Sequence, residues 1–91
     1  MFNFEWDDQK AASNLSKHGV SFDEAVSVFG DARALTFSDT DHGELEDRSR
    51  TYGVSNKMRL LVVIHTERRN GIRIISTRKA TRYEKGIYEN G

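Results

Sequence analysis

Three side chains in the second half of the chain have the types that proton transfer and phosphate binding require. His65 and Glu67 lie two residues apart at the end of an apolar segment, and Arg78 follows. An imidazole or a carboxylate can act as acid or base, and each such group accelerates a reaction about 10²- to 10⁴-fold. A guanidinium binds a phosphate through two parallel hydrogen bonds. This set suits cleavage of RNA through the neighbouring 2′-hydroxyl, which needs a base, an acid and fixed cations but no metal.

The turns of the chain predict which of these side chains share a face of a sheet. Asn70-Gly71 is a strong signal for a two-residue hairpin turn, because both residues tolerate the positive φ of a type I′ turn. Such a turn places His65 opposite Ser76 and Val63 opposite Arg78. Residues directly opposite one another point to the same face of an antiparallel pair. The predicted pairing therefore puts the imidazole and the guanidinium on one face.

The preceding hairpin extends this face. A tight connection over Ser55 to Met58 places Arg48 opposite His65 and Arg50 opposite Val63. The first face then carries Arg48, Arg50, Tyr52, Leu61, Val63, His65, Glu67, Ile74, Ser76 and Arg78. The second face carries Leu60, Val62, Ile64, Thr66, Arg68, Arg73, Ile75 and Thr77, and its apolar centre suits packing against helices. A slip of one residue would exchange the two faces.

Several further side chains extend the predicted RNA-binding surface. Tyr52 or Tyr83 can stack on an unpaired base, and Lys10 and Lys17 lie at helical spacing. The predicted phosphate- and RNA-binding side chains are Arg48, Arg50, Tyr52, Arg82, Tyr83, Lys10 and Lys17, beside the catalytic candidates His65, Glu67 and Arg78. Plainer interpretations remain open: the lysines can form a solvated helix face, and a histidine in a strand is often a hydrogen-bonded structural residue.

The charges are unevenly distributed along the chain. The formal net charge is zero, from 14 Lys plus Arg and 14 Asp plus Glu. Residues 1–47 carry 11 acidic and 3 basic side chains, whereas residues 48–91 carry 3 acidic and 11 basic ones. Such asymmetry indicates a polyanion-binding region or a charged partner. A predicted loop from Asp39 to Asp47 holds many of the acidic residues, and it is either a solvated connection or a competitor for the basic surface.

Two helices are predicted before the sheet. Asp7 can cap a helix that runs to about His18, and Gly19 ends it. Ser21 and Glu24 form a capping-box pattern at the start of a second helix, whose apolar stripe must face a sheet. The capping pattern recurs near the end of the chain, where it predicts a final helix over residues 81–89.

The remaining segments predict strands. Apolar alternation indicates a short strand over residues 2–6, followed by strands over residues 33–38, 48–54, 59–67 and 72–77. The element order is β-α-α-β-β-β-β-α. We therefore expect an α+β fold, in which a largely antiparallel sheet packs against an N-terminal helical pair and a C-terminal helix.

Length and composition limit the class of protein. Ninety-one residues suit a single domain spanning residues 1–91. The chain has no cysteine, which excludes disulfides and thiolate metal sites and suits a reducing compartment. No apolar run is long enough to cross a bilayer, and no signal peptide is visible. We expect a cytoplasmic protein that needs no cofactor or metal and does not bind a membrane.

Two long segments resemble the BrnT family of toxins. The first holds Phe4-Glu5-Trp6-Asp7, Lys10, Asn14, Lys17-His18-Gly19-Val20-Ser21-Phe22 and Glu24-Ala25. The second holds residues 60–68, from Leu60 to Arg68, then Arg73-Ile74-Ile75-Ser76, Arg78, Ala80, Thr81, Glu84 and Tyr88. Together they cover nearly the whole chain in the order and spacing of that family.

The resemblance implies a ribonuclease toxin of a type II toxin–antitoxin system, with a RelE-like fold, that cuts RNA and inhibits translation. It also implies a BrnA-type antitoxin partner, which neutralises the toxin in a complex of two toxins and two antitoxins and which alone contacts operator DNA. It favours His65, Glu67 and Arg78 as catalytic residues. The alternative hypothesis is a non-catalytic module that only binds RNA or protein, for which salt-sensitive binding without cleavage is expected.

Overall fold

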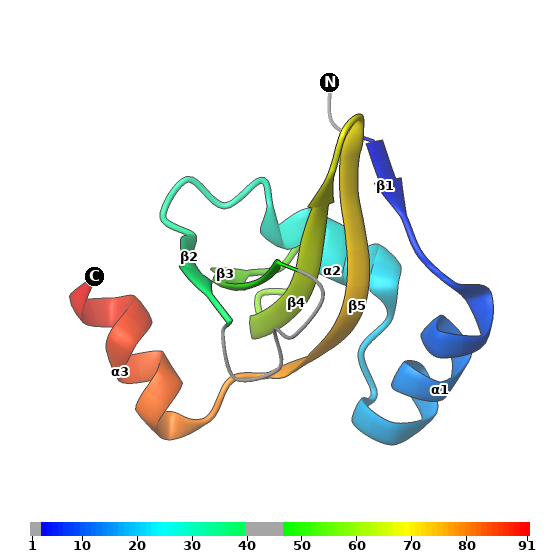
Figure 1. Cartoon of the computed structure of the whole chain (residues 1–91). Coiled ribbons are helices and arrows are strands. Elements are labelled where there is room, and N and C mark those ends of the chain that lie inside the picture. Colours follow the sequence, from blue (N-terminus) through cyan, green and yellow to red (C-terminus); the bar gives the residue numbers. More distant parts are fainter. Residues whose placement is uncertain (1–2, 40–46) are drawn as a thin grey trace.

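In the part of the chain that the structure describes, five strands form one sheet in the order β1-β5-β4-β3-β2, with β1 parallel to β5 and every other pair antiparallel. The computed structural model describes residues 3–39 and 47–91. The elements are β1 (Asn3–Glu5), α1 (Asp8–His18), α2 (Phe22–Val28), β2 (Leu35–Ser38), β3 (Arg48–Val54), β4 (Leu60–Arg68), β5 (Gly71–Lys79) and α3 (Arg82–Asn90) (Figure 1). This order confirms the α+β topology expected from the sequence. Most of the predicted acidic loop, residues 40–46, lies outside the described residues.

The helices begin and end where the sequence signals predict. The Asp7 side chain accepts hydrogen bonds from the backbone N–H groups of Gln9 and Lys10, and α1 ends at Gly19, whose φ of 70° suits glycine. The Ser21 hydroxyl accepts from Glu24 N at the start of α2. In α3 both halves of the predicted capping box form, because Thr81 and Glu84 each accept a hydrogen bond from the other's backbone N–H.

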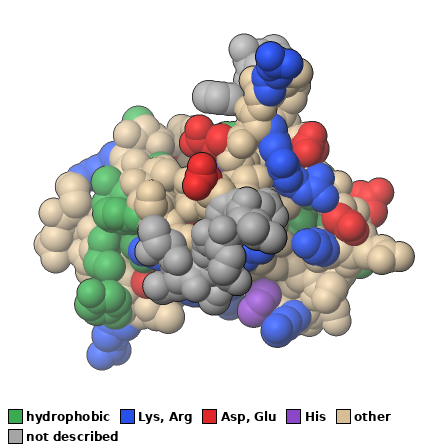
Figure 2. All heavy atoms as spheres, viewed as in Figure 1, with side chains coloured by type: hydrophobic (Ala, Val, Ile, Leu, Met, Phe, Trp, Pro, Cys, Tyr) green, Lys and Arg blue, Asp and Glu red, His purple; other side chains and the backbone are tan. Residues whose placement is uncertain are grey.

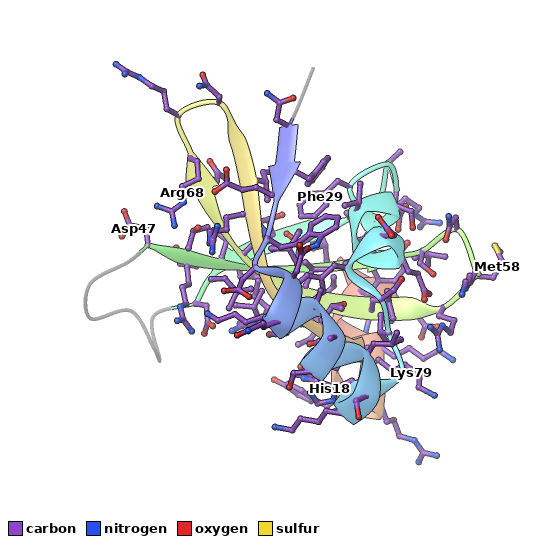
Figure 3. All side chains as sticks on the ribbon, turned by 90° about the vertical axis from the view of Figure 1, so that its right-hand side faces the viewer. His18, Phe29, Asp47, Met58, Arg68 and Lys79 are labelled. Carbon is purple, nitrogen blue, oxygen red and sulfur yellow. The ribbon has the colours of Figure 1, made fainter. Side chains whose placement is uncertain are left out.

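Helices α1 and α2 cover one face of the sheet, and we call this the helix face. Its core cluster contains Val20, Phe22, Ala25, Val28, Leu61, Val63, Ile72 and Ile74, with Phe4, Trp6, Ala11 and Phe29 packed against it. In Figure 3, Phe29 lies between α2 and the sheet, whereas Met58 lies at the far end of the β3–β4 turn. Helix α3 contacts β3 and carries Glu84 to the other face, which we call the open face.

The connection between β3 and β4 is one residue longer than predicted, because Val54 pairs with Leu60. Three residues, 56–58, connect Ser55 to Arg59, and Met58 has a φ of 61°. Arg50 therefore pairs with Ile64 instead of Val63, and Ser49 pairs with His65 instead of Arg48. A one-residue change of register turns the side chains to the opposite face. Arg48, Arg50 and Tyr52 consequently do not share a face with His65, and the predicted pairing is wrong.

The β4–β5 hairpin also differs from the prediction. Residues 69–70 form its turn, Arg68 pairs with Gly71, and neither Asn70 nor Gly71 has a positive φ, so the type I′ turn at Asn70-Gly71 is wrong. Gly71 instead lies beside β1, where a Cβ atom would collide with the backbone of Asn3. Glycine is required here for the close approach of two strands rather than for a turn.

A β-bulge in the same hairpin decides the position of Arg78. His65 pairs with Ile74 and Ile64 pairs with Ser76, so that Ile75 is an extra residue. Beyond the bulge, Arg78 pairs with Val62 instead of Val63. A bulge shifts the alternation of side chains by one position. Ser76 and Arg78 therefore lie on the open face, and the predicted pairs of His65 with Ser76 and of Val63 with Arg78 are wrong.

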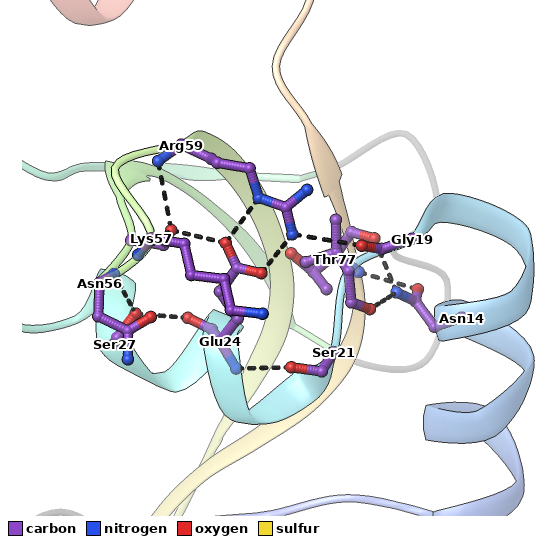
Figure 4. A network of polar contacts seen from close by, with 11 residues as sticks. Asn14, Gly19, Ser21, Glu24, Ser27, Asn56, Lys57, Arg59 and Thr77 are labelled. Carbon is purple, nitrogen blue, oxygen red and sulfur yellow. Dashed lines mark hydrogen bonds and ion pairs between the residues drawn. The ribbon is translucent and has the colours of Figure 1, made fainter.

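A polar network closes the helix face at the end opposite the β4–β5 tip (Figure 4). The buried Glu24 carboxylate pairs with the Arg59 guanidinium and accepts a hydrogen bond from the Ser55 hydroxyl at 2.6 Å. Asn14 Nδ2 donates to the carbonyls of Val20 and Thr77 at 3.0 and 2.9 Å. These contacts join both helices to β5 and to the β3–β4 turn, and they hold the turn that sets the register of β3.

Candidate phosphate-binding site on the open face

Cationic side chains from two strands line a hollow of about 480 Å³ on the open face. Arg48 and Arg50 come from β3, and Arg78 comes from β5, on the far side of β4. The remaining lining residues are Asp39, Tyr52, Ile64, Ser76 and Glu84. Three guanidiniums that converge on one hollow form a surface suited to a phosphate group.

Arg50 is held in place by its neighbours. Its Cζ atom lies 5.9 Å from the centre of the Phe37 ring and 5.8 Å from the centre of the Tyr52 ring. Its Nε donates a hydrogen bond to the Tyr52 hydroxyl at 3.1 Å, and its Nη1 lies 3.4 Å from Asp39 Oδ1. Aromatic faces attract a guanidinium electrostatically. These contacts fix the charge of Arg50 at the hollow.

Arg78 is held by Glu84. Its two terminal nitrogens donate to the two oxygens of the Glu84 carboxylate at 2.7 and 2.9 Å. The hydrogen bonds from Arg78 lower the pKa of Glu84 to about 2, although burial acts in the opposite direction. Glu84 is therefore ionised at neutral pH. It orients Arg78, caps α3 and partly neutralises the hollow.

Arg48 retains unused hydrogen-bonding capacity. Its Nε is buried and has no hydrogen-bond partner among the described residues. A buried donor without a partner costs about 1–3 kcal/mol. Because Nε has almost no accessible surface, a phosphate in the hollow would bind the terminal nitrogens of Arg48 instead, which can donate to two of its oxygens.

His65 lies on the helix face, away from this hollow. Its side chain is buried and its Nε2 lies 2.8 Å from the Thr51 hydroxyl, while the ring meets Phe29 edge-on at 5.0 Å between centroids. Burial lowers the pKa of His65, and the negative charge of Glu67 acts in the opposite direction. The imidazole is therefore neutral at neutral pH. The placement fits the structural interpretation that the sequence left open.

Glu67 lies near the tip of the β4–β5 hairpin. It is exposed and lines a second hollow of about 580 Å³ with Phe29, Thr36 and His65 and with residues of the tip. Figure 2 shows Lys and Arg side chains at this tip and on the surface below it, with acidic side chains between them. The structure thus brings Glu67 near His65, as predicted, but places both away from Arg78.

The other predicted RNA-binding residues are divided between the two sides. Tyr83 is 79% exposed and Arg82 is exposed, and both lie in the first turn of α3 next to Glu84. Tyr52 is only 3% exposed, so its ring cannot stack on a base, and its hydroxyl serves Arg50 instead. Lys10 and Lys17 are exposed on α1, which covers the helix face.

Three residues at the open face were absent from the predicted site. Asp39 was assigned to the acidic loop, Glu84 only to a helix cap, and Phe37 only to a strand. Alternation along β2 does place Phe37 on one face with Leu35, and Glu84 lies two residues from Arg82 and three from Thr81 in the same turn. Their partners on β3 and β5, however, depend on the register and the bulge.

In residues 3–39 and 47–91, no group of three or more His, Asp or Glu side chains is placed to hold a metal ion. In the same ranges, no helix combines the length and the apolar character that a membrane-spanning helix needs.

The fold has a known counterpart. It is similar to the crystal structure of the Brucella abortus ribonuclease toxin BrnT, with a TM-score of 0.71 and 24% sequence identity. The match covers 90% of this chain and 100% of the Brucella chain. Since the identity is low, this likeness shows a shared α+β fold and nothing more. No curated protein matches the sequence.

The sequence itself identifies the family. Residues 6–84 match the family model described as the ribonuclease toxin, BrnT, of type II toxin–antitoxin systems. The match includes β3, β4 and β5 and extends to Glu84 in α3. The chain belongs to the BrnT family of ribonuclease toxins. The resemblance recognised in the sequence is thereby confirmed.

Proposed function

We propose that this protein is an endoribonuclease toxin that cuts RNA in the cytoplasm, inhibits translation, and binds the scissile phosphate in the open-face hollow. The observation that supports the proposal best is the convergence of Arg48, Arg50 and Arg78 on that hollow. Negative charge develops on the phosphate oxygens as the 2′-oxygen attacks phosphorus and the bond to the 5′-oxygen breaks. Preorganised cations stabilise such charge without having to reorganise.

Proton transfer in this proposal uses the carboxylates of the hollow. The reaction moves the proton of the 2′-hydroxyl to a base, and the departing 5′-oxygen takes a proton from that base, once it is protonated, or from water. Glu84 is occupied by Arg78 and by the backbone N–H of Thr81, and its pKa of about 2 makes it a weak base. Asp39, with one long contact to Arg50, is therefore the better candidate for the base.

RNA cleavage by the purified protein in EDTA tests the proposal. We expect Arg50→Gln to lower the single-turnover rate by about 10²-fold or more, since removal of one preorganised donor has this effect in other enzymes. Lys57→Gln is the matched control, because it removes one exposed cation from the β3–β4 turn, outside the hollow. Salt-sensitive RNA binding without any cleavage would instead favour the non-catalytic module.

The same assay tests His65 and Glu67, which the sequence predicts to be catalytic and which lie outside the open-face hollow. If the reaction takes place on the open face, a folded His65→Gln variant and a Glu67→Gln variant should cut RNA at nearly the normal rate. Loss of cleavage in both variants, with normal cleavage by Arg50→Gln, would show that the reaction takes place in the hollow near the β4–β5 tip.

We further propose that a BrnA-type antitoxin neutralises the toxin by covering the open face, in a complex of two toxins and two antitoxins. Acidic side chains of the antitoxin would compete with RNA for Arg48 and Arg78, and operator DNA would be contacted through the antitoxin. Charge reversal at either arginine should weaken the complex and reduce its salt dependence. Unchanged affinity would place the antitoxin elsewhere.

A further inference from the structure

The edge of the sheet next to the open-face hollow carries an exposed aromatic ring. Phe37 in β2 is 39% exposed and does not belong to the core cluster under α1 and α2. Strand β2 is the last strand in the sheet order, so no other strand among the described residues pairs with its outer edge. Figure 2 shows hydrophobic side chains gathered over α3 and β2. Phe37 is therefore accessible from the side at which the hollow opens.

The ring of Phe37 is tied to the proposed phosphate-binding residues. Phe37 pairs with Arg50 in the β2–β3 register, and its ring centre lies 5.9 Å from Arg50 Cζ. The Phe37 and Tyr52 rings lie 5.6 Å apart at 55°, with the Arg50 guanidinium near both. Of these two rings, Tyr52 is buried and Phe37 retains free surface. The cluster thus offers one exposed aromatic face directly beside a phosphate-binding cation.

This arrangement suits a nucleotide better than an apolar protein segment. Single-stranded nucleic acids bind where a cationic groove holds the backbone and an aromatic side chain stacks on a base. A partner that used only apolar contact would have to bury the charge of Arg50 beside the ring with Asp39 as its paired anion, and that contact is long at 3.4 Å, so the burial would be costly. A nucleotide supplies both an anion for Arg50 and an aromatic base for Phe37.

We propose that Phe37 is the stacking platform of a nucleobase subsite, on which an unpaired base of the RNA lies while the adjoining phosphate occupies the open-face hollow. The proposal rests on the proposed function and adds a base-recognition residue to it. It requires that part of the binding affinity come from the base itself and that this part depend on the aromatic ring.

Binding of two short oligonucleotides tests the subsite. One probe is a five-nucleotide 2′-O-methyl oligoadenylate, which cannot be cut because its 2′-hydroxyls are blocked, and the other is the abasic strand of equal length and charge. The wild-type protein should bind the adenylate about tenfold more tightly than the abasic strand, as stacking of one base implies. Phe37→Leu keeps an apolar side chain against Tyr52 and Arg50 but removes the aromatic face. It should bind both probes equally, whereas Phe37→Trp should retain the difference.

The outcomes separate this proposal from the proposed function. If Phe37→Leu preserves the tenfold difference while melting like the wild type, Phe37 is not a nucleobase subsite, and the exposed ring is left to a partner protein. If the wild-type protein binds neither probe in a salt-dependent manner, the phosphate site and the subsite both fail. If Arg50→Gln weakens both probes by the same factor and Phe37→Leu weakens only the adenylate, both proposals stand.

Discussion

The hydroxyl of Thr51 lies 2.8 Å from His65 Nε2 on the helix face, while the adjacent residue of β3, Arg50, points to the open face. The same hydroxyl lies 2.8 Å from that of Thr36, so a chain of polar side chains crosses β2, β3 and β4. The sheet thus separates the buried neutral imidazole on its helix face from the cations of the hollow on its open face. We therefore expect a substitution of His65 to change the stability of the protein and substitutions in the hollow to change RNA binding.

The stability of the protein should fall at mildly acidic pH because of His65. The pKa of the buried imidazole is lowered from 6.5, so below pH 6.5 the unfolded chain takes up a proton that the folded protein does not. Stability is therefore lost as the pH falls through this window, by at most about 1.4 kcal/mol per pH unit. Urea denaturation at pH 7.5 and 5.5 measures this loss.

A His65→Gln variant supplies the control for this pH dependence. Glutamine does not titrate, and every other residue is the same in the two proteins, so the comparison isolates the contribution of His65. The variant should be less stable than the wild type at pH 7.5 but should lose less stability on going to pH 5.5. Glu84 does not contribute in this range, because its stabilisation is lost only between pH 4.5 and about 2. An equal loss in both proteins would contradict a neutral buried His65.

Removing Arg59 should destabilise the protein strongly. Glu24 is almost fully buried and would lose its charged partner, which is itself partly exposed, and a buried acceptor left without its partner costs about 1–3 kcal/mol. Arg73→Ala is the matched control, because Arg73 pairs with the exposed Glu5 and such pairs contribute about 0–1 kcal/mol. Urea denaturation at pH 7 measures both. Equal effects would show that the Glu24 network does not hold the turn.

Two glycine-to-alanine changes should have opposite effects on stability. A Cβ atom at Gly53 in β3 would lie 2.7 Å from Val28 Cγ1, so Gly53→Ala should cost about 1–3 kcal/mol through overpacking. A Cβ atom at Gly86 in α3 would have no neighbour within 4 Å, so Gly86→Ala should stabilise the helix by about 0.5–1 kcal/mol. Thermal melting measures the two shifts, and a stabilised Gly53→Ala protein would contradict the packing of α2 on β3.

Neutralising Glu84 should strengthen phosphate binding and weaken the fold. Glu84→Gln removes the carboxylate that occupies both terminal nitrogens of Arg78, which frees this guanidinium for RNA. We expect tighter RNA binding at low salt and a salt dependence steeper by about one phosphate contact. The weaker α3 cap should cost about 1 kcal/mol of stability. Weaker RNA binding in a folded variant would show that Glu84 is needed to position Arg78 for the substrate.

Local signals in the sequence predicted the order of the elements. Asp7, Ser21 and Thr81 act as helix caps through hydrogen bonds to residues two or three positions away, and Gly19 ends α1 through its own backbone conformation. Such interactions depend on neighbouring residues only. The family could also be recognised from motifs spread over most of the chain, and the match over residues 6–84 confirms it.

The two faces of the sheet were decided by the tertiary structure. Met58 adopts a left-handed conformation that a methionine does not signal, and the hydrogen bond from Ser55 N to the Arg59 carbonyl closes the three-residue turn. Gly71 pairs with β1, where a Cβ atom would collide with Asn3. The extra residue Ile75 forms a bulge that no local sequence pattern predicts. The β3–β4 turn and the bulge each shift the alternation by one residue, which is enough to exchange the faces. The change at Gly71 shifts the pairing by two residues and leaves the faces as predicted.

The sequence by itself therefore determined the kinds of side chain available, the helix ends and the concentration of cations in the second half of the chain. Only the tertiary structure decided that Arg48, Arg50 and Arg78 meet on the open face while His65 is buried under Phe29. The physical reason is that helix caps are local, whereas the pairing of strands depends on turn conformations and on contacts between residues far apart in the chain.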